Sequence, residues 1–115
     1  NLYPQDIEGV VEKVPGVRAG CVAAFAVAAD DGATDALAVV AEVDEAKLGD
    51  PSAAVVAIRS AVTEHYQVAP AVAPLIRPRS LATPASGKVQ RHAAKRALEE
   101  GSLDAVLAWP PESDR

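Results

Sequence analysis

The residues best suited to chemistry lie in one basic segment in the C-terminal third of the sequence. Between residues 77 and 96 the chain has six basic residues and no acidic one: Arg77, Arg79, Lys88, Arg91, Lys95 and Arg96. The whole chain has a net charge of −5, so the remaining residues together carry −11. A local positive field on an acidic protein attracts an anionic partner, or stabilises negative charge that develops during a reaction.

Lys88 is the basic residue whose neighbours most favour a reactive role. It directly follows Ser86 and Gly87, and glycine gives the backbone the freedom to enter a narrow site. The lysine ammonium is a compact, mobile charge that suits phosphate and carboxylate oxygens. The ordinary alternative is a solvated lysine near the start of a helix, and the sequence pattern by itself leaves both readings open.

Two other uses of this region fit the sequence less well. A nucleotide-binding P-loop needs a glycine five residues before its second glycine, and Ser or Thr directly after the lysine. Ala82 and Val89 occupy those two places, which excludes the P-loop. Ser102, in Gly101-Ser102-Leu103, could be a phosphopantetheine-bearing serine, but it follows a predicted helix instead of starting one in mid-chain.

The composition bounds the class of protein. A length of 115 residues predicts one domain with a modest core, built mainly from Ala and Val because aromatic residues make up only 3%. Overall acidity and the scarcity of stacking aromatics argue against nucleic-acid binding. Cys21 is alone, and His65 and His92 lie far apart, so we expect neither an internal disulfide nor a metal site.

The longest apolar run, residues 21–29, is too short to span a bilayer. No signal peptide is recognisable, which predicts a cytoplasmic location. The sequence begins with Asn1 and enters a helix signal at once, so we expect a piece of a longer protein.

The first half of the chain predicts a helix followed by a hairpin. Pro4 suits a first helical position, and an apolar stripe at i, i+3, i+4 and i+7 continues to Val14 before Pro15-Gly16 ends the helix. Residues 17–28 and 36–43 are apolar and Val/Ala-rich, which predicts two strands around a polar turn at 30–35. Residues 44–50 are expected to form a charged loop.

The second half predicts two helices and one further strand. Asp50 and Pro51 mark the start of a helix that runs to about His65. Residues 68–77 resemble a third strand, which Pro70 and Pro74 would confine to an edge or break. After a loop at 79–87, a helix is expected from about Val89 to Glu100, ended by Gly101, with a short turn over 102–108.

The order of these elements predicts an α+β fold, in which a short sheet of a hairpin and a third strand is covered by about three helices. The folded domain is expected to span residues 1–108, followed by a flexible tail at 109–115.

Two motifs in this sequence resemble those of a known family. The segment Pro78-Arg79-Ser80-Leu81-Ala82-Thr83-Pro84-Ala85-Ser86-Gly87-Lys88-Val89-Gln90-Arg91 is similar to the C-terminal lysine motif of adenylate-forming enzymes. The opening Asn1-Leu2-Tyr3-Pro4-Gln5-Asp6-Ile7-Glu8 is similar to the element just after that family's interdomain hinge. The residue pattern of this opening motif resembles that of the fatty acyl-AMP ligases more than that of the CoA ligases. The resemblance covers roughly residues 1–98.

The resemblance implies an activity that needs another domain. Such enzymes join ATP and a carboxylic acid into an acyl-adenylate in the presence of Mg²⁺, using ATP and acyl pockets in a large N-terminal domain that the present sequence lacks. By the resemblance, Lys88 is the lysine that the C-terminal domain inserts into that active site, with Ser86 and Gly87 as support in the loop.

The resemblance also implies partners. In fatty acyl-AMP ligases the acyl acceptor is usually the phosphopantetheine arm of an acyl carrier protein. Carrier proteins are acidic, so the candidate docking residues are Arg77, Arg79, Arg91, Lys95 and Arg96; the alternative is that these five only keep a helix soluble. The fatty acid substrate would be held by the N-terminal domain. An acyl-CoA or aryl-CoA synthetase domain, and a non-catalytic module that docks carrier proteins, stay as alternatives.

Overall fold

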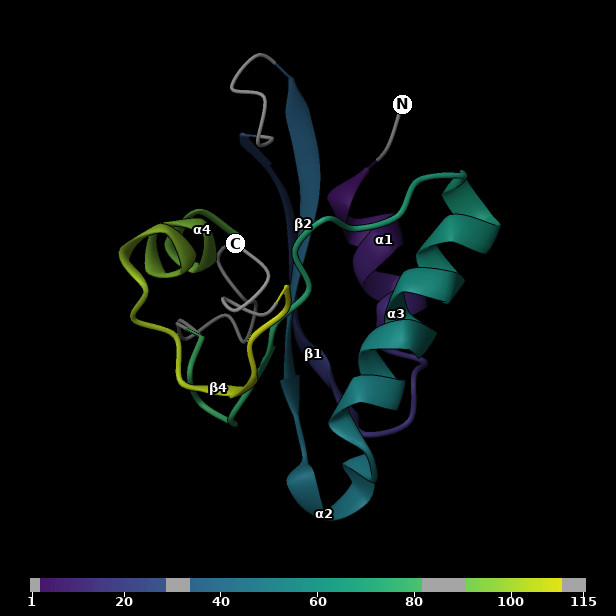
Figure 1. The fold of residues 1–115 in the computed structure, drawn as a ribbon, viewed down its shortest axis with the longest axis vertical. Coiled ribbons are helices and arrows are strands. Elements are labelled where there is room, and N and C mark those ends of the chain that lie inside the picture. The colour runs from purple at the N-terminus through teal and green to yellow at the C-terminus, as the bar shows by residue number, and fades with distance from the viewer. Residues whose placement is uncertain (1–2, 29–33, 82–90, 111–115) are drawn as a thin grey trace.

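The computed structural model describes residues 3–28, 34–81 and 91–110 of the chain. Figure 1 shows a central sheet with helices on both sides. The elements follow in this order: α1 (Pro4–Val11), β1 (Val17–Ala28), β2 (Asp35–Val43), α2 (Glu45–Leu48), α3 (Pro51–Tyr66), β3 (Leu75–Ile76), α4 (Arg91–Glu100) and β4 (Ala105–Leu107). The α+β class and the sheet covered by helices are therefore confirmed.

The long hairpin of β1 and β2 forms one side of the four-stranded sheet, whose strand order is β1-β2-β3-β4. The two strands pair antiparallel from Val22–Ala41 to Ala28–Asp35, and an irregularity between Val17 and Val22 shifts the register. Gly20, within that irregular stretch, has a φ of +76°, and its N–H donates to a carboxylate oxygen of Glu12 at 3.0 Å. Glycine tolerates such a φ without the clash that a Cβ would cause, which explains its place in a bulge.

The third strand is shorter than its apolar run predicted. Only Leu75–Ile76 forms a strand, with an isolated bridge between Val72 and Ala38 before it. Pro70 and Pro74 account for the shortening, because proline has no N–H to donate to a sheet. Of the two predicted outcomes, an edge strand or a broken one, the strand is broken and does not lie at an edge: β3 pairs parallel with β2 on one side and antiparallel with β4 on the other. β4 itself was expected to be a turn.

The helix starts follow the capping residues. Asp44 accepts the N–H of Ala46 at 3.0 Å and begins α2, a short helix in a segment that was expected to be a loop. Asp50 accepts the N–H of Ser52 at 3.1 Å and begins α3 at Pro51, as predicted. At the other end of α4, Gly101 has a φ of +72°, the left-handed conformation of a helix C-cap.

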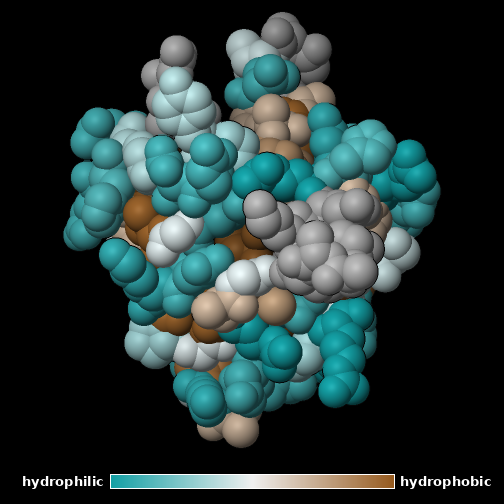
Figure 2. Space-filling view, turned by 180° about the vertical axis from the view of Figure 1, so that it is seen from behind, coloured by the Kyte–Doolittle hydropathy of each residue, from teal (hydrophilic) through white to brown (hydrophobic). Residues whose placement is uncertain are grey.

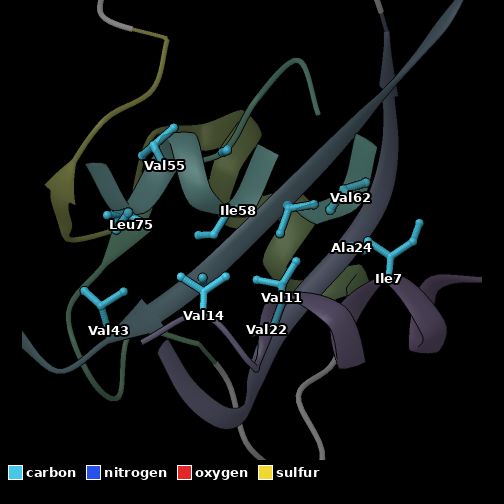
Figure 3. Close-up of a cluster of buried hydrophobic side chains, with 14 of the residues drawn as sticks. Ile7, Val11, Val14, Val22, Ala24, Val43, Val55, Ile58, Val62 and Leu75 are labelled. Carbon is cyan, nitrogen blue, oxygen red and sulfur yellow. The ribbon is translucent and has the colours of Figure 1, made fainter. Parts of the chain in front are cut away.

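The larger hydrophobic cluster lies on the face of the sheet that α1 and α3 cover. Figure 3 shows Ile7 and Val11 of α1 and Ile58 and Val62 of α3 gathered around side chains of the hairpin such as Val22. These residues are at most 4% exposed. The small Val and Ala side chains let the helices pack closely on the sheet, as the composition predicted.

A second, smaller cluster lies on the opposite face, beneath α4. Ala23, Val40, Ile76, Leu81 and Ala94 are its buried members. Residues alternate between the two faces of a strand, so Val40 and Glu42 of β2 face α4 while Val39, Ala41 and Val43 face α3. The sheet is therefore covered on both faces, and α4 lies on the opposite side from α1 and α3 in Figure 1.

Trp109 packs against the domain, although it is the first residue of the tail predicted at 109–115; residues 111–115 lie outside the described residues. Trp109 packs against the larger cluster, and the guanidinium carbon of Arg59 lies 4.4 Å from the centre of its ring. The carbonyl of Trp109 accepts the N–H of Ala73 at 3.1 Å. These contacts tie the segment after β4 to α3 and to the approach to β3.

The surface carries no broad apolar area on the face seen in Figure 2. Hydrophilic side chains cover most of that face, and hydrophobic ones appear in several separate places. Of the described residues, Tyr3 and Val56 are the large hydrophobic side chains that stand exposed, at 57% and 63%. No helix in the described part of the chain is long and apolar enough to cross a membrane.

Candidate functional site

The candidate site is the segment that contains Lys88. Ser86, Gly87 and Lys88 lie outside the described residues, so their roles stay predictions. The described residues that flank the segment are Leu81 on one side and Arg91 on the other. The site is therefore best described through the contacts that hold these two flanks.

The N-terminal flank is held by the carboxylate of Glu42. One oxygen accepts the backbone N–H of Arg79 at 2.9 Å, and the other accepts that of Leu81 at 2.9 Å. Glu42 is only 2% exposed, and the Nε of Arg18 on β1 lies 3.7 Å from it. A buried carboxylate is costly unless it is paired and hydrogen-bonded, and these partners meet that requirement.

The backbone at Arg79 has an unusual conformation. Its φ is +70°, in the left-handed region that residues other than glycine rarely adopt. Such a conformation persists only where the surroundings fix it, and it is often found near functional sites. Glu42 supplies that constraint by accepting the N–H of Arg79 and the N–H two residues later. Leu81, 4% exposed, then packs into the cluster beneath α4.

The C-terminal flank is held by an ion pair between Arg91 and Glu8. The guanidinium donates from Nε to one carboxylate oxygen at 2.7 Å and from Nη2 to the other at 2.8 Å. Glu8 also accepts the backbone N–H of Ala24 on β1 at 2.9 Å. The hydrogen bond to Glu8 raises the pKa of Arg91 above its ordinary value, while burial acts in the opposite direction. The contact joins α4 to α1 and to β1.

This ion pair brings the two sequence motifs together. Glu8 belongs to the opening motif and Arg91 ends the lysine motif, 83 residues later. Bidentate arginine–carboxylate pairs are among the stronger polar contacts and fix geometry as well as distance.

The remaining basic residues differ in what they contact. Arg77 is engaged: its Nη1 lies 2.7 Å from a carboxylate oxygen of Asp104 and donates to the carbonyl of Ala105 at 3.0 Å, and its Nε lies 3.6 Å from Glu45. The side chain of Arg96 contacts the ring of His92 at 3.3 Å. Among the described residues, the side chains of Arg79, Lys95 and Arg96 have no acidic partner.

The described residues hold no metal-like cluster and only shallow hollows. No group of three His, Cys, Asp or Glu side chains in the described ranges could hold a metal ion. One hollow of about 320 Å³ is lined mostly by apolar residues, among them Ile7, Phe25 and Leu37. None of the described basic candidates, Arg77, Arg79, Arg91, Lys95 and Arg96, lines it.

Sequence reasoning did not assign a role to either carboxylate. Glu8 stands in the opening motif, but nothing local indicates that it pairs with an arginine 83 residues away. Glu42 carried one usable signal: it is the only charged residue of the predicted strand 36–43. A lone acid in an apolar strand is either at an exposed edge or bound to buried donors, and here it is the second.

Comparison with curated proteins finds a relative whose sequence matches most of the chain. The chain is 39% identical over 107 residues to the medium-chain-fatty-acid–[acyl-carrier-protein] ligase JamA of Moorena producens. The match covers 90% of the chain but 18% of the relative. No family model matches the chain.

Comparison with solved structures gives the same class of protein. The structure of McyG A-PCP complexed with phenylalanyl-adenylate superposes with a TM-score of 0.80 at 29% identity, over 88% of the chain and 18% of that protein. The fatty acid AMP ligase from Legionella pneumophila superposes with a TM-score of 0.71 at 27% identity, over 93% of the chain and 19% of that protein. The chain therefore spans about a fifth of the length of the proteins that it matches.

The sequence match and the structural matches each cover at least 88% of the chain. The fold joins the two motifs through Glu8 and Arg91. In sequence and in fold, the chain therefore resembles a part, about a fifth in length, of proteins that form acyl-adenylates.

Proposed function

We propose that the chain is the C-terminal domain of a longer fatty acyl-AMP ligase. That enzyme would activate a fatty acid with ATP and transfer the acyl group to the phosphopantetheine thiol of an acyl carrier protein. The observation that carries this proposal is the 39% identity to JamA, whose name describes a ligase of medium-chain fatty acids and acyl carrier protein. The isolated chain is expected to be inactive, because the ATP and acyl pockets would belong to the N-terminal domain.

In this proposal Lys88 acts in the first half-reaction. A carboxylate oxygen of the fatty acid attacks the α-phosphorus of ATP, and the bond to pyrophosphate breaks. Negative charge builds on the oxygens around phosphorus, and the ammonium of Lys88 would bridge those oxygens and the acyl carboxylate. A positioned charge of this kind both aligns the attack and stabilises the transition state. Mg²⁺ would be held with ATP by the N-terminal domain.

The acidic carrier protein is proposed to dock on the basic surface of α4 and of the segment before Lys88. Arg79, Lys95 and Arg96 are the stronger candidates, because their side chains have no acidic partner among the described residues. Arg77 and Arg91 already pair with Asp104 and Glu8, so recruiting them would mean breaking an internal contact. Charge pairs at the rim of an interface mainly affect the rate of association and its salt dependence.

The structural likeness to McyG A-PCP favours a second candidate. That structure contains phenylalanyl-adenylate, and its TM-score of 0.80 exceeds that of the Legionella ligase. Activation of an amino or aryl acid is therefore the alternative substrate class. A substrate panel for the full-length enzyme, with free CoA and carrier protein offered as acceptors, separates the candidates. Efficient acyl-CoA formation would instead support a CoA synthetase.

The test is Lys88→Ala in the full-length enzyme that contains this chain. We expect pyrophosphate release that depends on fatty acid to fall by at least about 100-fold, the scale seen when one charge-stabilising group is removed. Transfer from supplied acyl-adenylate to the carrier protein should change by less than about threefold. Unchanged pyrophosphate release would refute the role of Lys88, and a wild-type protein without any adenylation would favour a non-catalytic docking module.

A further inference from the structure

The two flanks of the lysine segment are each held by one carboxylate, and neither carboxylate lies within the segment. Glu42 accepts the N–H groups of Arg79 and Leu81, and Glu8 pairs with Arg91. We propose that Glu8 and Glu42 are positioning residues for Lys88, because they fix both ends of the segment that presents it. This inference rests on the proposed function, in which Lys88 reaches the reacting atoms.

The contacts of Glu42 fix the position of the backbone at Arg79 and Leu81 more than they add to the stability of the fold. An acid at 2% exposure in an apolar strand costs more than an apolar residue of the same shape, unless every oxygen has a partner. Its two oxygens are used by two backbone N–H groups of one short stretch, and that stretch has the positive φ at Arg79. A backbone outlier held by a buried carboxylate fixes the backbone of Arg79 and Leu81, the last described residues before the segment.

The Glu8 contacts fix the other end. The carboxylate is 12% exposed and has three short contacts, two from the guanidinium of Arg91 and one from the N–H of Ala24. Ala24 is fully buried in β1, so the carboxylate is itself held by a buried part of the sheet. Lys88 precedes Arg91 by three residues, which span at most about 11 Å when extended. Fixing Arg91 therefore limits the volume that Lys88 can reach.

A purely structural role is the alternative, and the two roles differ in what they predict for the half-reactions. Loss of a merely structural contact lowers both half-reactions together, through the amount of folded protein. Loss of a positioning contact lowers adenylation, which uses Lys88, and spares transfer, which does not. A misplacement of about 1 Å near reacting atoms can cost roughly 100-fold in rate, so the ratio of the two rates is a sensitive readout.

The chain supplies matched controls for both carboxylates. Glu12, four residues after Glu8, also accepts a β1 backbone N–H, that of Gly20 at 3.0 Å, and has no hydrogen bond or ion pair with the described residues of the lysine motif. Asp44, two residues after Glu42, accepts the N–H of Ala46 and likewise has no hydrogen bond or ion pair with residues 78–81 or Arg91. Glu12→Gln and Asp44→Asn therefore make the same change in charge without touching the flanks of the segment.

The experiment compares Glu8→Gln, Glu42→Gln and the two controls in the full-length enzyme, with pyrophosphate release and transfer from acyl-adenylate measured separately. We expect adenylation to fall about 10- to 100-fold in the first two variants, and transfer to change by less than about threefold. Both controls should keep both rates within about threefold of wild type. Equal losses in both half-reactions, or no loss of adenylation, would overturn the proposal.

Two further measurements cover the case in which Glu42→Gln does not fold. Arg91→Lys keeps the charge but loses the bidentate geometry, so adenylation should fall about tenfold while transfer is kept. In the 115-residue chain itself, the amides of Arg79 and Leu81 should exchange with solvent at least about tenfold more slowly than the exposed amide of Gly49. Rapid exchange at both would overturn the role of Glu42.

The outcome for Lys88→Ala separates this inference from the proposed function. If Lys88→Ala leaves adenylation unchanged, the proposed function is wrong. If Lys88→Ala lowers adenylation but the Glu8 and Glu42 variants do not, only this inference is wrong.

Discussion

The guanidinium of Arg91 donates two hydrogen bonds to the carboxylate of Glu8, and this pair links α4 to α1 across the edge of the β1–β2 hairpin. The contact is formed by residues 83 positions apart, each from a different motif of the adenylate-forming type. It is therefore a tertiary contact that only the folded chain can make, and its contribution to stability is measurable in the chain alone.

Breaking this pair should destabilise the chain more than its partial exposure suggests. Hydrogen bonds to charged groups contribute about 1.5–3 kcal/mol, and removing Arg91 leaves Glu8 largely buried with one partner. We expect Arg91→Ala and Glu8→Ala each to lower the free energy of unfolding by about 2 kcal/mol in urea titrations. The double variant should lose at least about 1 kcal/mol less than the sum. Arg96→Ala, on the same helix, is the control and should change stability by less than about 0.5 kcal/mol. Additive losses would contradict a direct interaction.

Two glycines of the N-terminal region should respond to alanine in opposite directions. Gly16 has a φ of +93°, and a Cβ there would lie 2.7 Å from the backbone Cα of Leu48. Gly16→Ala should therefore lower the free energy of unfolding by at least about 2 kcal/mol, through strain and overlap. Gly9 lies within α1 with nothing within 4 Å of its Cβ position, so Gly9→Ala should raise stability by about 0.5–1 kcal/mol. Thermal unfolding of the pair checks both signs.

Trp109 should behave as a core residue and not as part of a tail. It packs on the larger cluster under the guanidinium of Arg59, and it is the only tryptophan in the chain. We expect Trp109→Ala to cost about 2–4 kcal/mol, since it loses both packing and a cation–π contact. Tryptophan fluorescence and far-UV circular dichroism should report the same urea midpoint in the unaltered chain. A fluorescence change well before the loss of helix signal would show that residue 109 detaches on its own.

The thiol of Cys21 should ionise at higher pH in the folded chain than in the unfolded one. Burial raises its pKa above the ordinary value of 9.0, and the hydrogen bond with Arg18 acts in the opposite direction. Between the ordinary and the raised pKa the folded chain keeps a proton that the unfolded chain releases, so stability falls as pH rises above about 9. The alkylation rate should therefore reach half its maximum at a higher pH in buffer than in urea. Because Cys21 is the only cysteine, the signal is unambiguous; equal midpoints would contradict the shift.

The parts of the fold that depend on local pattern were predictable from sequence. The hairpin and α3 follow from apolar runs, Asp50 with Pro51, and the polar turn between the strands. The fourth strand was not predictable, because Ala105–Leu107 is too short to show alternation and pairs with β3 only through tertiary structure. The position of β3 inside the sheet was missed for a related reason: the prolines shorten the strand without deciding which neighbours it has.

The candidate site was predictable in its basic residues but not in what holds them. The residue pattern of the lysine motif identifies Lys88 and the basic residues around it, because both are local features of the sequence. The roles of Glu8 and Glu42 depend on contacts across 83 residues and across 37 and 39 residues, which no local pattern encodes. The same limit explains why the five arginines and lysines looked equivalent in sequence, although two of them form internal ion pairs.

The placement of the two carboxylates has a consequence for how this domain can change over evolution or by engineering. Glu42 binds backbone N–H groups, and Glu8 binds the residue that starts α4, so neither depends on the side chains of the nine residues at 82–90. A graft that replaces the side chains between Leu81 and Arg91 would therefore leave these anchoring contacts in place. The contacts of the two carboxylates and the sequence of the segment can be altered separately in engineered variants.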